Sequence, residues 1–248
     1  MKEAMEVFSA WSNKMIDEKL NKSPLEERNV DLLDMMLESF EDTSLTRKEL
    51  LNNIFLFFLA GHESQTGTLT ATLYFLSRHQ EVQDKVREEL AHTLNGNAPT
   101  YDSVKSLQYL SQVINESSRL LGPVTAITRI AKSDCSIEGY HVPKNTFLIL
   151  VLINMHKDKD IWGDDVLQFN PERWSPENSK KIPKHCFCPF GLGPRTCLAS
   201  NYANLQLRIT LVKLLQRFKF TVATPEYIVS RSITVRPQPN FMLGIHKL

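Results

Sequence analysis

Cys197 stands in a setting that suits metal chemistry, because it follows a loop with two glycines and a proline and precedes a helical pattern. The loop at 190–199 reads FGLGPRTCLA, and apolar residues recur at helical spacing through 198–218. A thiol at a helix N-terminus meets unpaired backbone N–H groups and the positive end of the helix dipole, which favour the metal-binding thiolate. Phe190 supplies an apolar wall, and Arg195 could neutralise an acidic group on the same ligand.

Four residues of this loop, Phe190, Gly193, Arg195 and Cys197, form the pattern Phe-x-x-Gly-x-Arg-x-Cys. The pattern resembles the haem-binding loop of the cytochrome P-450 family. The resemblance implies haem b (iron protoporphyrin IX) as the cofactor and Cys197 as the thiolate axial ligand of its iron, a ligand type that favours O–O cleavage. The other three residues would contact the haem. The alternative is a buried, inert cysteine after a glycine-rich turn.

A second run, AGHES, interrupts an apolar pattern that predicts a long helix over about residues 44–78. An acid and a hydroxyl inside such a helix, Glu63 and Ser64, must be satisfied, and Gly61 costs about 1 kcal/mol relative to alanine. The run resembles the oxygen-binding groove of the same family. There, small residues such as Ala60 and Gly61 make room over the haem, and an acid–alcohol pair relays protons to dioxygen. The alternative is a helix–helix crossing with small residues at the contact.

Glu116 and Arg119 lie three residues apart in a helix expected over about 104–121, so they share a face. An exposed ion pair of this kind contributes little to stability. The pair resembles the family's Glu-x-x-Arg motif, which Arg173 in the run PERW would complete, with Trp174 where phenylalanine is more usual. The resemblance implies a buried Glu116–Arg119–Arg173 network that holds the cysteine loop in place.

Weaker matches surround these motifs. Arg129 corresponds by position to a family arginine that pairs a haem propionate, and an ordinary strand arginine is an equal alternative. His156 and Trp162 also fit a family pattern, in which their role is packing. By the same resemblance Val124–Ile127 and Pro239–Phe241 would face the substrate. Their apolar character suits a small hydrophobic substrate.

The elements that must position these residues are mainly helical with minor strand content, an α+β class. Thr43, Ser44 and Glu49 are plausible start residues for the long helix, whose middle, IFLFFLAG, is apolar on all sides and therefore expected to be buried. The remaining patterns predict helices at 31–40 and 81–93, strands and turns through 124–153, an ordered meander at 157–189, and a small β-hairpin region in the last thirty residues.

Composition limits the alternatives. The chain has 248 residues and a formal net charge of +1, so charge gives no argument for nucleic-acid binding. Its apolar runs are too short to span a bilayer, so a transmembrane segment is not expected. No C-x-x-C spacing occurs among its four cysteines, so a reducing compartment is expected. We expect a single domain over 1–248.

The resemblance implies the cytochrome P-450 fold and a haem-thiolate monooxygenase of the eukaryotic microsomal type, which receives electrons from NADPH through a separate reductase. The sequence begins just before the oxygen-groove helix, so it matches the C-terminal half of the fold and is expected to be truncated, without the N-terminal half and its membrane anchor. The family suggests the endoplasmic reticulum membrane; without an anchor the chain would be cytoplasmic or peripheral. Its apolar strand at 146–153 would keep an open edge and an uncovered face, so the isolated chain would bind haem weakly, or aggregate, unless another polypeptide covered that surface. The alternative function is a catalytically incompetent remnant that acts through binding a partner.

Overall fold

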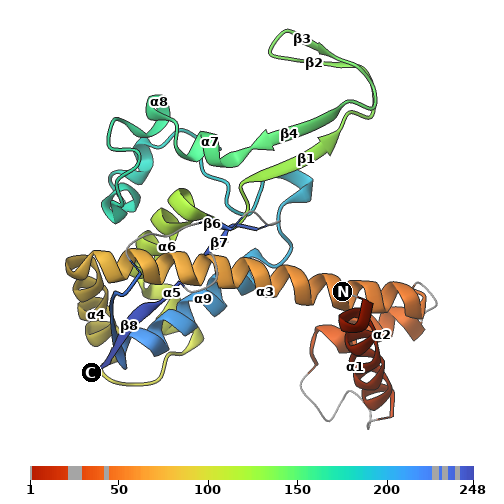
Figure 1. The fold of residues 1–248 in the computed structure, drawn as a ribbon, viewed down its shortest axis with the longest axis horizontal. Helices are drawn as coiled ribbons and strands as arrows, with labels where there is room; N and C mark the ends of the chain where they lie inside the picture. Colours follow the sequence, from red (N-terminus) through yellow and green to blue (C-terminus); the bar gives the residue numbers. More distant parts are fainter. Residues whose placement is uncertain (1, 22–29, 42–44, 225–228, 231–233, 238–240) are drawn as a thin grey trace. The chain divides into compact units, whose positions relative to one another are not determined.

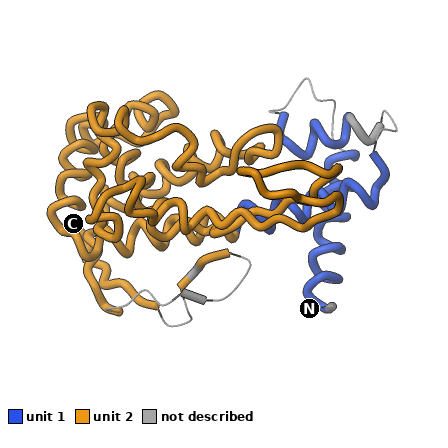
Figure 2. Tube along the Cα trace, turned by 90° about the horizontal axis from the view of Figure 1, so that it is seen from above, with its two compact units in different colours: residues 1–62 blue, residues 63–248 orange. Residues whose placement is uncertain are grey.

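A computed structural model describes residues 2–21, 30–41, 45–224, 229–230, 234–237 and 241–248. The described part is mainly helical with short antiparallel strands, which confirms the expected α+β class. The chain divides into two compact units, residues 1–62 and 63–248, and the long helix α3 contributes to both (Figure 2). None of the helices in the described ranges is long and apolar enough to cross a membrane.

The helices and strands, labelled in Figure 1, have the following bounds. The helices are α1 (Lys2–Leu20), α2 (Leu32–Glu41), α3 (Arg47–Arg78), α4 (Gln80–Leu94), α5 (Tyr101–Ser106), α6 (Gln108–Leu121), α7 (Leu152–His156), α8 (Lys159–Trp162) and α9 (Ser200–Leu215), with 3-10 turns η2 (Pro171–Trp174), η3 (Ser179–Lys181) and η4 (Gly193–Arg195). The strands are β1 (Ala126–Ile130), β2 (Cys135–Ile137), β3 (Tyr140–Val142), β4 (Phe147–Val151), β5 (Phe218–Val222), β6 (Val229–Ser230), β7 (Arg236–Pro237) and β8 (Leu243–Lys247).

Helix α3 begins with a capping box. The Thr46 hydroxyl accepts a hydrogen bond from the Glu49 N–H, and the Glu49 carboxylate accepts one from the Thr46 N–H. This reciprocal pair satisfies two backbone donors and sets the helix start at Arg47. The start residues expected at 43 and 44 lie outside the described residues.

The first unit packs α1, α2 and the N-terminal part of α3 around a small core of Ile16, Leu37 and Leu50. The expectation that the IFLFFLAG run is buried on every side is wrong: the Leu56 side chain is 58 % and the Phe58 side chain 54 % exposed. Full burial needs neighbours all around a helix. Within this unit the ring of Phe8 on α1 packs against Phe55 and Phe58, and Ile54 packs against the small core.

The second unit has the main core, to which α3, α4, α5, α6, α9 and β5 contribute. The helix expected over 104–121 is two helices, because the chain breaks at Leu107, whose side chain is fully buried. The carboxylate of Glu89 accepts hydrogen bonds from the backbone N–H groups of Tyr109 and Leu110, and so supplies partners for the first turn of α6. The Glu-x-x-Arg motif is therefore on a helix with its own start.

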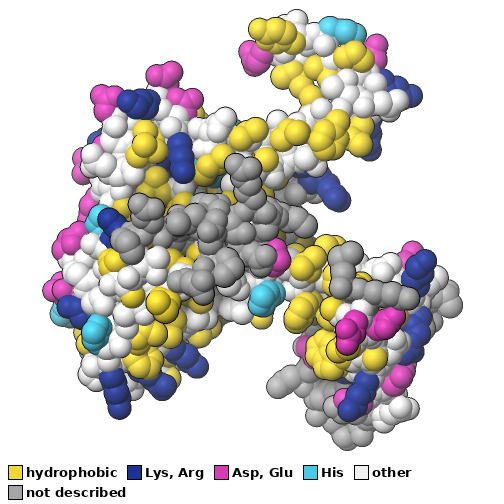
Figure 3. Space-filling view, in the orientation of Figure 1, with side chains coloured by type: hydrophobic (Ala, Val, Ile, Leu, Met, Phe, Trp, Pro, Cys, Tyr) yellow, Lys and Arg dark blue, Asp and Glu magenta, His cyan; other side chains and the backbone are white. Residues whose placement is uncertain are grey.

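The strands pair only as antiparallel ribbons in the described part of the chain. Strand β1 pairs with β4, from Ala126 opposite Val151 to Ile130 opposite Phe147, and β2–β3 forms a hairpin that continues this arm (Figure 1). Apolar side chains gather on the arm's surface (Figure 3), where Phe147 and Ile149 are each about 60 % exposed. The apolar strand expected at 146–153 is thus β4, which pairs with β1.

Candidate cofactor site

The cysteine loop is closed by backbone hydrogen bonds. The Cys197 N–H donates to the Phe190 carbonyl over 2.8 Å, and the Thr196 hydroxyl donates to the same carbonyl over 3.3 Å. At the start of the loop the Gly191 N–H donates to the Cys188 carbonyl over 2.9 Å. These bonds fix the backbone on both sides of Cys197, whose side chain is exposed and thiol free.

The helix after the loop starts later than expected. Helix α9 begins at Ser200, with Ala199 as its N-cap, and it ends at Leu215 instead of continuing to residue 218. Cys197 therefore lies two residues before the N-cap, not in the first turn, because residues 198 and 199 form a turn. Cys197 is still close to the start of α9 in sequence, but in the described residues its thiol makes no observed contact with the first-turn N–H groups.

The loop surface beside the thiol is open. Gly191 and Gly193 have φ angles of +74° and +72°, which non-glycine residues rarely adopt. A Cβ atom added at Gly193 would meet nothing within 4 Å. The neighbouring side chains of Leu192 and Leu198 are 44 % and 86 % exposed. An open glycine with apolar neighbours is the surface against which a flat, apolar cofactor packs.

Two arginines from the predicted set are available for an anionic partner. Arg195 is exposed in the 3-10 turn η4, and Arg129 is half-buried on β1, where its Nη1 donates to the Thr128 carbonyl over 2.8 Å. Within the described ranges, no carboxylate lies within ion-pair distance of either guanidinium. The same ranges hold no cluster of three His, Cys, Asp or Glu residues that could bind a metal ion. A haem needs only one axial cysteine, so an exposed thiol, an open glycine surface and two arginines fit this cofactor.

The predicted oxygen-groove residues lie on α3. Ala60 and Gly61 belong to the first unit, are exposed, and a Cβ added at Gly61 would meet nothing within 4 Å. Glu63 and Ser64 belong to the second unit and are half-buried. The Glu63 carboxylate accepts a hydrogen bond from the hydroxyl of Thr234 over 2.9 Å. A residue 171 positions away in the chain thus orients the acid.

Gly67 explains how the Thr234 segment reaches α3. A Cβ at Gly67 would lie 2.7 Å from the Val235 carbonyl oxygen and 3.1 Å from the Pro123 Cβ. The Val235 N–H in turn donates to the Pro123 carbonyl over 2.7 Å. Glycine is therefore the residue that allows the backbone around 235 to approach the helix, one turn beyond Glu63.

The structure brings Glu116, Arg119 and Arg173 together in the second unit. The Glu116 side chain is fully buried, and its Oε1 accepts hydrogen bonds from Arg119 Nη2 (2.8 Å), the Asn170 N–H (3.1 Å) and Arg173 Nε (3.3 Å). Its Oε2 accepts from Arg119 Nε (2.9 Å) and from the indole N–H of Trp174 (3.0 Å). Five donors surround one carboxylate, so the two buried charges of opposite sign are paired and hydrogen-bonded.

The two arginines extend this cluster to neighbouring segments. Arg119 donates to the His156 carbonyl over 2.9 Å and lies over the Trp162 ring, 5.0 Å from its centroid. Arg173 donates to the Trp162 carbonyl and forms an ion pair of 2.5 Å with Asp165. The hydrogen bond from Arg173 lowers the pKa of the Asp165 carboxyl below its ordinary value. The cluster thus joins α6, α7, α8 and η2.

Sequence reasoning missed three contributors. Trp174 was noted only as an unusual replacement, although its indole N–H is a donor that phenylalanine lacks. Thr234 had no signal, because its contact with Glu63 depends on how distant segments pack. His156 was expected only to pack, yet its ring nitrogen accepts a hydrogen bond from the Cys188 N–H over 3.3 Å.

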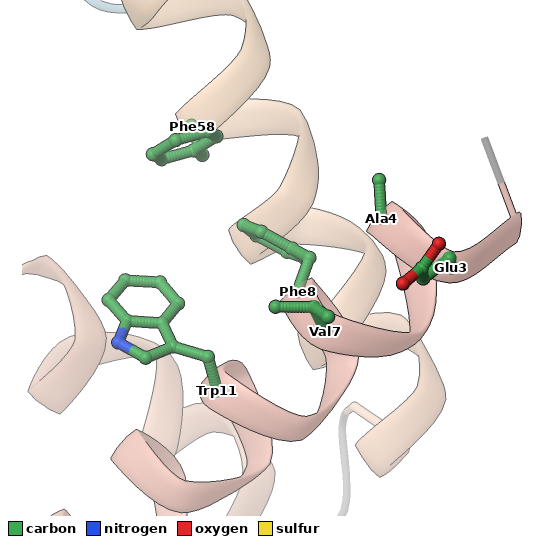
Figure 4. A pocket seen from close by; sticks show the side chains of 6 residues that line it. All are labelled: Glu3, Ala4, Val7, Phe8, Trp11 and Phe58. Atoms are coloured by element: carbon green, nitrogen blue, oxygen red, sulfur yellow. The ribbon is translucent and has the colours of Figure 1, made fainter.

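The first unit has a cavity that none of the predicted site residues lines. In the first unit an open hollow of ≈ 630 Å³ lies between α1 and α3 and is lined by Val7, Phe8, Trp11 and Phe58, with Glu3 at its edge (Figure 4). Its lining contains none of the predicted site residues. It offers a mainly apolar surface, with Glu3 as the charged residue among those that line it.

Comparison with known proteins agrees with the motifs. The family model described as Cytochrome P450 matches residues 1–245. Similar curated proteins include cytochrome P450 3A16 of Mus musculus, 30 % identical over 98 % of this chain and 50 % of its own length. Secologanin synthase 2 of Catharanthus roseus is 34 % identical over 85 % of this chain and 42 % of its own length. Cytochrome P450 734A1 of Arabidopsis thaliana is 40 % identical over 79 % of this chain and 38 % of its own length.

The chain therefore belongs to the cytochrome P450 family. It spans about half the length of the curated relatives it matches.

Proposed function

We propose that this chain carries the haem-thiolate half of a monooxygenase that inserts one atom of dioxygen into a small hydrophobic substrate. The observation that carries the proposal is the exposed Cys197 thiol on a loop whose backbone is fixed by the Phe190 carbonyl. A bound haem would supply dioxygen activation, and the thiolate of Cys197 would hold its iron. The remaining steps depend on the chain's own residues.

The loop residues and the arginines would bind the cofactor. Phe190 and the open backbone at Gly193 would lie against the porphyrin, and Arg195 and Arg129 would pair with its propionates. The planar guanidinium supports this assignment, because it can bind a carboxylate bidentately.

The groove residues would manage space and protons. Ala60 and Gly61 leave room beside α3, while Glu63 and Ser64 would hold and pass the proton that dioxygen reduction consumes. The hydrogen bond from Thr234 supports this role, since it fixes one oxygen of the Glu63 carboxylate. Side chains at 124–127 are half-buried and largely apolar, which suits a hydrophobic substrate.

Electrons would come from NADPH through a separate reductase, at the endoplasmic reticulum membrane, as the family resemblance implies. The second candidate is a catalytically incompetent remnant that acts, if at all, through binding a partner.

Oxygen labelling separates the two candidates. The haem-loaded chain, a reductase, NADPH and a panel of small hydrophobic compounds are incubated under ¹⁸O₂, and products are analysed by mass spectrometry. One ¹⁸O atom per product, absent with Cys197→Ser, supports the monooxygenase. Bound haem with no labelled product for any compound supports the remnant.

A further inference from the structure

His156 touches both the buried ion cluster and the segment that begins the cysteine loop. It is the last residue of α7 and is 3 % exposed. Its carbonyl oxygen accepts a hydrogen bond from Arg119 Nη1 over 2.9 Å, and its ring Nε2 accepts one from the Cys188 N–H over 3.3 Å. The ring also packs against Phe187, with centroids 5.4 Å apart.

From Cys188 a short series of hydrogen bonds leads to Cys197. The Cys188 carbonyl accepts the Gly191 N–H over 2.9 Å, which closes the first turn of the loop. The Phe190 carbonyl within that turn accepts the Cys197 N–H over 2.8 Å. The position of the thiol therefore depends on the turn, and the turn's first residue is held by the imidazole.

We propose that His156 is a positioning residue, whose neutral ring anchors the cysteine loop to the Glu116–Arg119–Arg173 cluster by accepting the Cys188 N–H. This proposal rests on the proposed function, in which the loop carries the cysteine that binds the haem iron. It assigns to the ring a directional hydrogen bond in addition to packing. Within the described residues, the acceptor of the Cys188 N–H is this ring nitrogen.

The surroundings of the ring keep it an acceptor. Burial, and secondarily the charge of Arg119 on α6, lower the pKa of His156 to about 4, so the ring is neutral near pH 7 with its proton on Nδ1. Lys157, the next residue, also has a lowered pKa from burial and Arg119. The loop presents the Cys186 and Cys188 thiols, and burial raises the pKa of Cys188, so it stays uncharged. Within the cluster Glu116 pairs with both Arg119 and Arg173, and Arg173 also pairs with Asp165.

Two substitutions separate the hydrogen bond from packing. His156→Phe keeps a ring against Phe187 but removes the acceptor, and His156→Gln places an amide oxygen near the position of Nε2. Val86→Ala is the control, because it creates a cavity in the main core with no contact to the loop.

The first measurement is amide hydrogen exchange of the Cys188 N–H by NMR in the full chain, with and without haem. We expect exchange about fivefold faster in His156→Phe, the factor that one ordinary hydrogen bond gives, and near the parent rate in His156→Gln. The second is the absorption band of the ferrous carbon monoxide complex. We expect the fraction of the complex that absorbs at the thiolate-ligated position to fall in His156→Phe, to recover in His156→Gln and to stay unchanged in Val86→Ala.

Equal exchange of Cys188 in the parent and His156→Phe would overturn the proposal. So would equally fast exchange in both His156 variants, since that result assigns the ring to packing alone. Failure of the proposed function would give a different result, in which Cys197→Ser leaves the absorption band of the ferrous carbon monoxide complex unchanged from the parent. The exchange rates decide the role of His156 in that case as well, because they need no haem.

Discussion

Glu116→Gln should destabilise the fold far more than its conservative size suggests. The carboxylate accepts five hydrogen bonds, three at Oε1 and two at Oε2. A glutamine offers one oxygen. If that oxygen takes the three-donor position, the amide NH₂ faces the Arg119 Nε and the Trp174 indole N–H, which are both donors. Two charge-assisted bonds at about 1.5–3 kcal/mol each give a loss of about 3–6 kcal/mol, which overlaps the loss of about 3–5 kcal/mol that is typical when one member of a buried ion pair is removed.

Glu172→Gln is the matched control, because Glu172 lies on the neighbouring turn and its ion pair with Lys85 is half-exposed. An exposed pair of this kind contributes at most about 1 kcal/mol. Urea unfolding at pH 7.5, followed by circular dichroism, gives both free energies of unfolding. The reasoning is refuted if Glu116→Gln costs no more than Glu172→Gln.

Three further changes have defined outcomes. The pKa of His156 is about 4 in the folded chain against an ordinary 6.5, so between these pH values the unfolded chain binds a proton that the folded chain does not. The free energy of unfolding should therefore fall by up to about 3 kcal/mol as the pH drops from 6.5 to 4. In urea titrations His156→Gln should remove this loss. Gly67→Ala should cost about 1–2 kcal/mol in the same assay, because its Cβ meets the Val235 carbonyl, whereas Gly61→Ala should stabilise by up to about 1 kcal/mol; equal effects would contradict the packing argument. Ser64→Thr should raise product formed per NADPH, because the added methyl restricts χ1; unchanged coupling would argue against a proton relay at this position.

Local chemistry made part of the structure predictable. Asn95 ends α4 in the left-handed conformation, and Asn145 has a φ of +68° in the expected turn before β4. Both are residue types that tolerate this conformation, so the sequence alone indicates the ends. The motif around Cys197 likewise predicted a loop, and in the structure both of its glycines have positive φ angles.

What the sequence could not indicate depends on contacts between distant segments. The break at Leu107 follows from Glu89, which offers acceptors to the next helix start. The hydrogen bond between Thr234 and Glu63 joins residues 171 positions apart. Periodicity also misled at Leu56, since an apolar surface indicates a need for burial without showing what covers it. The roles of the site residues stay predictions.

Reduction of the haem-supplemented chain under carbon monoxide, beside Cys197→Ser, tests the central claim most directly. The account predicts that the haem bound by the parent gives an absorption band of the thiolate-ligated type, and that this band is lost in Cys197→Ser. A band typical of a neutral ligand in the parent, or the same band in both proteins, would contradict the assignment of Cys197 as the axial ligand.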